Sequence, residues 1–302
     1  MAANIDDQPA GGGVPFALGA YAIWGLLPLY LLAVRAVPPL ELVGWRILFT
    51  VPVCLIIITA RRQWPDLMRA LLDRRILGWL CLSAVLIGTN WTIYLAAIDA
   101  GHVYAASLGY YINPLINVLI GTIFLKEKLS SPQWVAVGLA AAGVVILTSG
   151  ALTMLWISIS LAISFALYGL VRKFVPVGSL PGLTVEALIL TIPAIAVLAH
   201  FAAGPNGVVF GHNHGLDLAI AMAGVVTATP LLLFAIAARR MDYSTLGFIQ
   251  FLAPTIVFFL GLTVFGEPLR LTQLCSFVFI WMAIAVFAWD LWHRRSEAPG
   301  KA

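Results

Sequence analysis

Charged residues are scarce in this sequence. Asp, Glu, Lys and Arg together make up 10% of the 302 residues, whereas apolar residues make up 62%. The mean hydropathy is +1.00, although about a quarter of the residues in a typical soluble domain are charged. Water cannot be the main solvent of such a chain. The composition therefore excludes a soluble globular protein.

Cysteine is also rare, and the three cysteines show neither a CxxC pair nor Cys–His spacing. The sequence therefore predicts neither a disulfide framework nor a zinc site. His212 and His214 stand near Asp217, but two histidines without a defined third ligand do not specify a metal site. We predict no metal and no cofactor. The cysteines are Cys54, Cys81 and Cys275.

Motifs of ATP-driven and catalytic proteins are missing as well. The chain has no GxxxxGK phosphate-binding loop, which argues against a pump driven by ATP, and no HExxH zinc motif. No two carboxylates in the apolar runs share one face at one depth, as an intramembrane acid–base pair would require. We therefore predict that the protein is not an enzyme.

Long apolar runs, by contrast, recur along the whole chain. Each is about 20 residues long, which is the length needed to cross a hydrocarbon layer about 30 Å thick. The first run does not resemble a cleavable signal, because Asp6 and Asp7 precede it without any Lys or Arg. We predict an all-α integral membrane protein with ten transmembrane helices. The predicted spans are 14–34, 40–60, 76–98, 103–125, 133–148, 152–171, 182–201, 216–238, 244–265 and 270–292.

The basic residues predict the orientation. Ten spans place both ends of the chain on one side, and 14 of the 17 Lys and Arg residues then fall on that side. Only Arg35 and Arg270 fall on the other side, and Arg46 lies inside a span. Because cytoplasmic loops are enriched in Lys and Arg, we predict that both termini are cytoplasmic. The basic residues report orientation and do not imply a nucleic-acid partner.

An internal repeat is visible at an offset of 140 residues, where Gly121 and Glu127 match Gly261 and Glu267. Chance similarity among Leu-rich helices is the alternative, but apolar composition alone does not easily align Gly and Glu in this way. Since each half has five spans, an odd number, the second half must cross the membrane in the opposite direction. Inverted repeats of this kind are typical of transporters with alternating access. The predicted organisation is a tail (1–13), a first five-helix repeat (14–149), a second, inverted repeat (150–292) and a second tail (293–302).

Two prolines predict breaks in transmembrane helices, because proline removes one backbone hydrogen bond and frees the carbonyl four residues earlier. Pro114 and Pro254 lie near the middle of their spans, and the freed carbonyls belong to Tyr110 and Gln250. Such carbonyls need protein or a water-filled cavity beside them, where they can bind a ligand. A packing kink is the alternative for either proline. The matched pair favours a functional role.

Polar and aromatic side chains near the middle of the membrane predict a solute site. Asn90 and Tyr94 share one face of a helix, because they are four residues apart. Hydrogen bonding between helices is the alternative role for each amide. The predicted solute-binding residues are Arg46, Asn90, Trp91, Tyr94, Tyr110, Asn113 and Gln250.

Ionisable residues within the spans are rarer than these polar and aromatic residues. Arg46 lies six residues into its span, roughly 9 Å along the helix axis, and we predict that it attracts an anionic or polarisable solute. Glu186 lies four residues into a later span and is the candidate for coupling transport to protons. The two residues start from opposite faces, so no direct pair between them is assumed. Side chains that extend to the membrane surface are the alternative for both.

The chain resembles the RarD-type, chloramphenicol-sensitivity branch of the EamA transporters, in the drug/metabolite transporter superfamily. The likeness covers nearly the whole sequence and includes AYAIWGLLPLY, AVLIGTNW, ASLGYYINPLIN, SFALYGLVRK and STLGFIQFLAPT. The resemblance implies ten helices from two EamA repeats, an inner-membrane location and transport without ATP hydrolysis. It supplies no substrate. Related members have His before the arginine of the second helix, where this chain has Trp45 before Arg46, which weakens a proton relay through that position.

We therefore predict a secondary transporter that exports a small metabolite or drug-like solute. A membrane sensor or scaffold that does not transport is the alternative, and an intramembrane enzyme is disfavoured. The expected partners are a small-molecule solute and membrane lipid, with no nucleic acid. Small residues from Ala136 to Gly143 permit close helix packing, either within the fold or in a homodimer.

Overall fold

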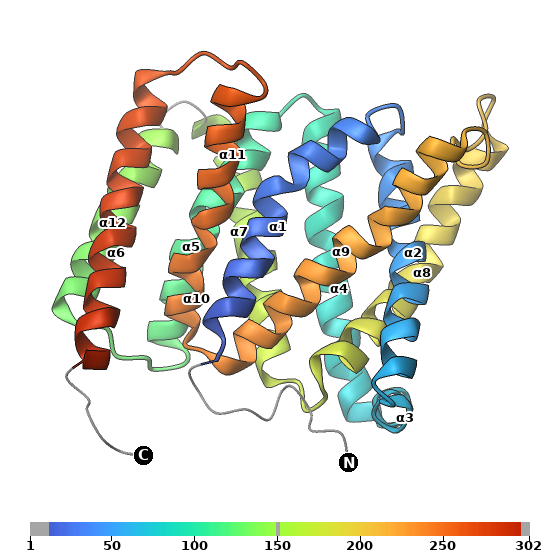
Figure 1. Ribbon diagram of the computed structural model, residues 1–302, viewed down its shortest axis with the longest axis horizontal. Helices are drawn as coiled ribbons and strands as arrows, with labels where there is room; N and C mark the ends of the chain where they lie inside the picture. The colour runs from blue at the N-terminus through green and yellow to red at the C-terminus, as the bar shows by residue number, and fades with distance from the viewer. Residues whose placement is uncertain (1–11, 149–151, 297–302) are drawn as a thin grey trace. The chain divides into compact units, whose positions relative to one another are not determined.

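The computed structural model describes residues 12–148 and 152–296, and all regular structure within these ranges is helical (Figure 1). Long apolar runs form helices because every backbone polar group inside a membrane must be satisfied within the segment itself. The boundary expected between residues 149 and 150, and most of both predicted tails, lie outside the described residues. The helices are α1 (Val14–Ala33), α2 (Pro39–Ala60), α3 (Trp64–Leu72), α4 (Arg74–Asp99), α5 (Val103–Ile123), α6 (Ser131–Thr148), the short 3-10 helix η2 (Leu152–Met154), α7 (Leu155–Phe174), α8 (Ser179–Ala203), α9 (His214–Arg240), α10 (Tyr243–Gln250), α11 (Leu252–Thr263) and α12 (Leu271–Ser296).

Within the described part of the chain, ten helical stretches are long and apolar enough to cross a membrane, by length and composition. Each coincides with one of the predicted spans, and no end differs by more than three residues. The prediction of an all-α membrane protein with ten transmembrane helices is therefore confirmed.

The two prolines affect their helices differently. The ninth span is interrupted at Phe251, where α10 ends and α11 begins, three residues before Pro254. In contrast, α5 continues through Pro114 from Val103 to Ile123, so the interruption expected there is not found. A single missing hydrogen bond can be tolerated where a neighbouring helix supports the chain. Here α10 crosses α5 so closely that a Cβ atom on Gly247 would lie 2.7 Å from the carbonyl oxygen of Pro114.

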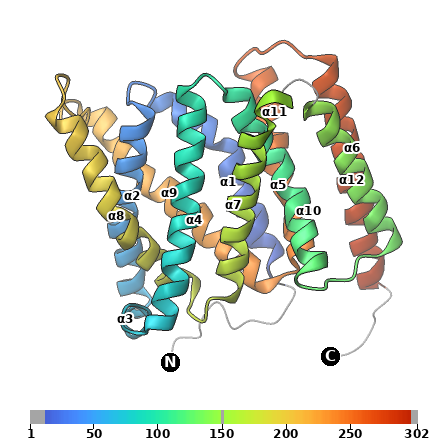
Figure 2. The same cartoon turned by 180° about the vertical axis from the view of Figure 1, so that it is seen from behind.

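Helix α3 was not predicted. Its nine residues are too few to cross a membrane, but they form a strongly amphipathic helix. Leu67 and Ala70 are buried, whereas Trp64, Met68 and Leu72 are exposed. The helix packs against α8, and Figures 1 and 2 show it at the end of α2. The loop expected between the second and third spans is therefore partly ordered as a helix.

The chain divides into two compact units. Unit 1 consists of Met1–Leu95 and Leu167–Met241. Within it, α2 packs along α8 and α9, and α1 packs along α9. The contact between α2 and α9 is tight, since any side chain at Gly224 would collide with the backbone of Phe49.

The last turns of α7 and α9 in unit 1 are joined by two basic side chains. The Nζ atom of Lys173 donates hydrogen bonds to the carbonyl oxygens of Ala238 and Met241, at 2.9 and 2.7 Å. In return, Nη1 of Arg239 donates to the carbonyl oxygens of Val175 and Val177, at 2.8 and 2.6 Å. These bonds satisfy carbonyl groups that the ends of helices leave open.

Unit 2 consists of Ala96–Ala166 and Asp242–Ala302. Within it, α5 packs against α10 and α6, and α6 packs along α12. The stripe of small residues lies in this last contact: Ala136 and Ala140 are fully buried, and a Cβ atom on Gly143 would lie 2.8 Å from the carbonyl oxygen of Ser276. The stripe therefore serves packing within the fold, and it gives no support to a homodimer.

The two units do not follow the two predicted repeats, because each unit contains helices from both. Three packed pairs, α2 with α8, α5 with α10, and α6 with α12, join elements that correspond in the two repeats. Such pairs are expected when repeats are related by an approximate two-fold axis. The inverted repeat itself stays a prediction.

Candidate functional site

Arg46 lies in unit 1 between three helices. It is half-buried on α2, and its Nε atom donates a hydrogen bond to Oγ1 of Thr227 on α9, at 2.9 Å. Its guanidinium group lies over the ring of Trp91 on α4, 5.4 Å from the ring centre. A cation over an indole face is an attractive arrangement. The arginine is therefore held in place by both a hydroxyl group and an aromatic ring.

Further aromatic groups surround this cation. The hydroxyl groups of Tyr30 and Tyr94 are close enough to interact electrostatically with Arg46. Tyr30 also donates a hydrogen bond to the carbonyl oxygen of Ala219, at 3.0 Å. Asn90 is half-buried on α4, one helical turn before Tyr94. The structure thus brings together Arg46, Trp91 and Tyr94, which the sequence predicted as solute-binding residues.

The carboxyl group of Glu41 is bonded to protein groups on two segments. Its side chain is fully buried, and Oε1 accepts hydrogen bonds from the indole of Trp45 at 3.0 Å and from the backbone N–H of Val209 at 2.8 Å. Trp45 also packs against Phe210. Glu41 therefore joins the start of α2 to the loop before α9.

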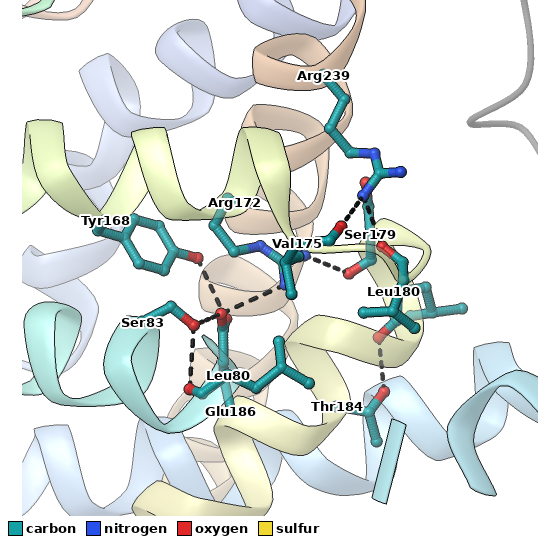
Figure 3. A network of polar contacts seen from close by, with 11 residues as sticks. Leu80, Ser83, Tyr168, Arg172, Val175, Ser179, Leu180, Thr184, Glu186 and Arg239 are labelled. Carbon is teal, nitrogen blue, oxygen red and sulfur yellow. Dashed lines mark hydrogen bonds and ion pairs between the residues drawn. The ribbon is translucent and has the colours of Figure 1, made fainter. Parts of the chain in front are cut away.

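Glu186 forms the centre of a buried ionic network in unit 1 (Figure 3). Its Oε1 atom accepts a hydrogen bond from Ser83 and pairs with Nη1 of Arg172 at 3.3 Å. Its Oε2 atom accepts a hydrogen bond from Tyr168 at 3.3 Å. Nη2 of Arg172 donates to the carbonyl oxygen of Ser179 at 2.7 Å. The side chains of Arg172 and Glu186 are 0% and 2% exposed, so both charges depend on these partners.

A cavity of about 20 Å³ lies between this network and the Arg46 cluster, which is room for roughly one water molecule. Glu186 and Tyr168 line it, as do Trp91 and Thr227, which both contact Arg46. The lining residues come from α2 and α4 of the first predicted repeat and from α7, α8 and α9 of the second. They are Ile47, Thr50, Ile87, Trp91, Tyr168, Leu183, Glu186, Ala187, Leu190, Thr227 and Leu231.

Unit 2 has a neutral polar cluster instead. Nδ2 of Asn117 donates to Oε1 of Gln250 at 2.8 Å and to Oδ1 of Asn113 at 3.3 Å. Nδ2 of Asn113 donates to the carbonyl oxygen of Ala162 at 2.6 Å. All three amides are buried, and Oδ1 of Asn117 has no hydrogen-bond partner within the described residues. The cluster joins α5 to α7 and to the end of α10, and it leaves one acceptor open.

The sequence as a whole matches known membrane proteins. Residues 11–149 match the EamA-like transporter family. The chain is 41% identical over 294 residues to an uncharacterized transporter of Pseudomonas aeruginosa, covering 95% of this chain and 97% of that protein. The chain belongs to the EamA family. It is also 40% identical over 288 residues to the protein RarD of Salmonella typhimurium, again covering 95% of this chain and 97% of that protein.

A solved crystal structure shares the fold of this chain. The two have a TM-score of 0.72 and 19% sequence identity, over 92% of this chain and 97% of the other. The predicted RarD-type membership is confirmed by the RarD relative. The names of the matched family and of the Pseudomonas relative indicate transport rather than catalysis. The protein is a multi-pass protein of the bacterial inner membrane. The cytoplasmic position of both termini stays a prediction.

Two features of this EamA protein were missed at the sequence level. Arg172 was assigned to a loop, but it is a buried residue of α7 and the partner of Glu186. Its spacing of four residues from Tyr168 could have placed both on one helix face. Ser83, the second partner of Glu186, had no such signal.

The remaining predicted residues have separate environments. Tyr110 is 53% exposed, whereas the amides of unit 2 are buried. Asp217, near His212 and His214, accepts a hydrogen bond from the backbone N–H of Gly211 at 2.8 Å. Asn213 caps the start of α9 through the N–H groups of Gly215 and Leu216. The loop is therefore organised around the helix start.

Proposed function

We propose that this protein is a secondary transporter that exports a small metabolite or drug-like solute by alternating access of its two repeats. The observation that carries the proposal is the cavity in unit 1. Its wall combines side chains from both predicted repeats and separates a cation from a buried carboxylate. Movement of one repeat against the other would change this wall directly.

In this proposal Arg46 attracts the solute. A guanidinium group offers several N–H donors in one plane and suits a carboxylate or another planar anion. Trp91 and Tyr94 provide flat apolar surface beside it, and Asn90 extends the same wall by one helical turn. The preferred solute is therefore amphipathic, with an anionic or strongly polarisable group near Arg46 and an aromatic or apolar body against α4.

Glu186 is the proposed coupling residue. It is the membrane carboxylate that borders the cavity, so a single water molecule in that space could exchange a proton with it. Neutralising Glu186 would weaken its pair with Arg172, and the first turns of α8 would then be free to move. Since the cavity holds roughly one water molecule in this conformation, solute entry requires such a movement.

The amides of unit 2 have a different proposed role. Asn113 and Gln250, although predicted to contact solute, are bonded to protein groups in this structure. Contact between these two groups and a solute would require these bonds to open. We place the principal binding site at Arg46 and give the amide cluster and Tyr110 a secondary part.

The test is transport by purified protein in liposomes. Solutes that stabilise the protein against heat are selected first and then tested for uptake driven by a pH gradient. Arg46→Ala should raise the solute concentration needed for half-maximal uptake, and Asn113→Ala should have a smaller effect. Glu186→Gln should abolish the response to the pH gradient. The proposal fails if all three variants are folded and transport as the wild type does.

Binding without flux would instead favour a membrane sensor. The cavity bordered by both repeats argues against that alternative, because a sensor needs no wall that changes with the repeats. We also propose a fold that is stable as a monomer. Crosslinking at low protein-to-lipid ratio should yield monomers, and dimers alone would contradict this.

A further inference from the structure

The two turns that follow the matched helices of unit 2 have the same backbone conformation. In the α5–α6 turn, Glu127 N–H donates to the carbonyl oxygen of Gly121 at 2.9 Å, and Lys126 has a φ of 56°. In the α11–α12 turn, Glu267 N–H donates to the carbonyl oxygen of Gly261 at 2.9 Å. The residue before it, Gly266, has a φ of 64°. Each turn therefore presents a carboxylate in the same way.

Of these two carboxylates, that of Glu127 caps a helix in the described part of the chain. Its Oε1 atom accepts the backbone N–H of Tyr243 at 2.7 Å. Its Oε2 atom accepts the N–H of Ser244 at 2.9 Å and the hydroxyl group of Ser244 at 2.6 Å. These groups form the first turn of α10, where a negative charge is favourable because helix N–H groups are unsatisfied there. The side chain of the preceding Asp242 makes no capping bond.

Glu267 has the same position in its turn but a different environment. Its side chain is exposed, and it accepts no hydrogen bond from the described residues. In the first turn of α5, which corresponds to the first turn of α10, Val103 is 55% and Tyr104 is 42% accessible, whereas Ala105 and Ala106 are buried. Figure 1 shows the α11–α12 turn and the start of α5 at one end of unit 2, and the α5–α6 turn and the start of α10 at the other end. One carboxylate caps the helix start beside it, and its counterpart does not.

The glycines of the two turns, Gly121 and Gly261, differ in how much space surrounds them. A Cβ atom on Gly121 would collide with the carboxylate of Glu127 and would lie 2.5 Å from the hydroxyl oxygen of Ser244. A Cβ atom on Gly261 would lie 3.3 Å from Oε2 of Glu267, with no other neighbour closer than the carboxyl carbon of that residue. The contact of Glu127 and Ser244 with position 121 therefore requires glycine there. At position 261, a small shift of the Glu267 side chain would make room for a Cβ atom in this conformation. A second conformation in which Glu267 caps α5 would require Gly261 for the same reason.

We propose that Glu127 and Glu267 are alternating helix caps of the transport cycle. In the conformation described here, Glu127 caps α10 at one end of unit 2. In the opposite conformation, Glu127 releases α10, and Glu267 caps the first turn of α5 at the other end. This inference rests on the alternating access of the proposed function, and it identifies the residues that hold each state closed.

The test measures the two ends separately and needs no solute. Cys54→Ala, Cys81→Ser and Cys275→Ser remove the native thiols. Thr245→Cys, beside Ser244 and 8% exposed, then reports on the α10 end, and Val103→Cys reports on the α5 end. Labelling rates with a maleimide are measured in membrane vesicles. In the parent protein Thr245→Cys should label slowly and Val103→Cys rapidly.

Glu127→Ala should accelerate labelling at Thr245→Cys on the order of tenfold, as expected for loss of a charged cap. It should also slow labelling at Val103→Cys, because the population shifts to the state capped by Glu267. Adding Glu267→Ala should restore rapid labelling at Val103→Cys. Gly121→Ala should act like Glu127→Ala, and Gly261→Ala should keep the α10 end closed.

Two results would overturn the inference. One is an unchanged rate at Thr245→Cys in a folded Glu127→Ala protein. The other is protection of Val103→Cys that does not depend on Glu267. Because labelling is independent of transport, a failure to find any transported solute would leave this test valid. Conversely, if transport depends on Arg46 but Glu127→Ala leaves the labelling rates unchanged, the alternating caps are rejected and the proposed transport function is retained.

Discussion

The two units solve the problem of buried polar groups in different ways. Unit 1 encloses an ion pair, Arg172 with Glu186, supported by Ser83 and Tyr168. Unit 2 encloses neutral amides, which bond mainly to one another. An ion pair can change its charge when a proton binds, whereas amides cannot. Under the proposed function, a response to protons therefore belongs in unit 1, and the polar core of unit 2 positions helices.

The strongest test of this difference is Arg172→Met. Removal of the arginine leaves Glu186 buried without its counter-charge, and breaking a buried ion pair costs roughly 3–5 kcal/mol. Unfolding of the purified protein in detergent should show this loss. The double variant Arg172→Met/Glu186→Gln is the control and should recover much of the stability. Equal losses in the single and double variants would show that packing, rather than charge, is responsible.

Asn117→Leu tests the neutral cluster of unit 2. It removes the donor to Gln250 and Asn113, and hydrogen bonds between membrane helices contribute about 1–2 kcal/mol in model systems. The same unfolding assay should therefore show a smaller loss than for Arg172→Met. If the loss equals that of Arg172→Met, the contrast between the units is wrong.

Tyr168→Phe sharpens the contrast within unit 1. It removes one hydrogen bond to Glu186 but keeps the ring, so the loss in stability should be about 1 kcal/mol. Transport should persist with an altered dependence on pH, because the carboxylate has lost a partner that favours its charged form. Tyr243→Phe, which removes a buried hydroxyl from unit 2, is the matched control and should leave the pH profile in place.

Arg46→Lys should have the smallest effect on stability, within about 0.5 kcal/mol, because the residue is half-buried and keeps its charge. Lysine lacks the planar group that bonds Thr227 and lies over Trp91. The solute concentration for half-maximal uptake should rise several-fold while the maximal rate changes little. A lower maximal rate at unchanged affinity would assign Arg46 to the conformational step instead.

The spans could be predicted because length and apolar composition alone determine whether a segment can cross a membrane. The depth predicted for Arg46 and Glu186 rests on the same count and stays a prediction. The partner of Glu186 could not be predicted, because the sixth helix lies three residues further along the chain than predicted, and this shift brings Arg172 into the helix. Helix α3 was missed for a related reason: its buried face is only two residues wide, and its polar residues resemble those of a loop.

Hydrogen-bond partners on different helices could not be predicted from the sequence either. Periodicity places Asn113 and Asn117 on one face of α5, but it cannot show that Gln250, on a different helix, completes the cluster. Nor could it show why Pro114 and Pro254 differ. The outcome depends on which backbone packs against each proline, and Gly247 supports Pro114 from outside α5.

The crossed bonds at the ends of α7 and α9 determine how these helices can move. Lys173 and Arg239 each hold two carbonyl oxygens of the other helix end. A slide of even one residue, 1.5 Å along a helix, would misalign all four bonds, whereas a rotation about this point would preserve them. The two helices therefore share a pivot at this end. Tyr168 and Thr227, further along each helix, would separate as the angle widens, so a small rotation at the pivot enlarges the cavity.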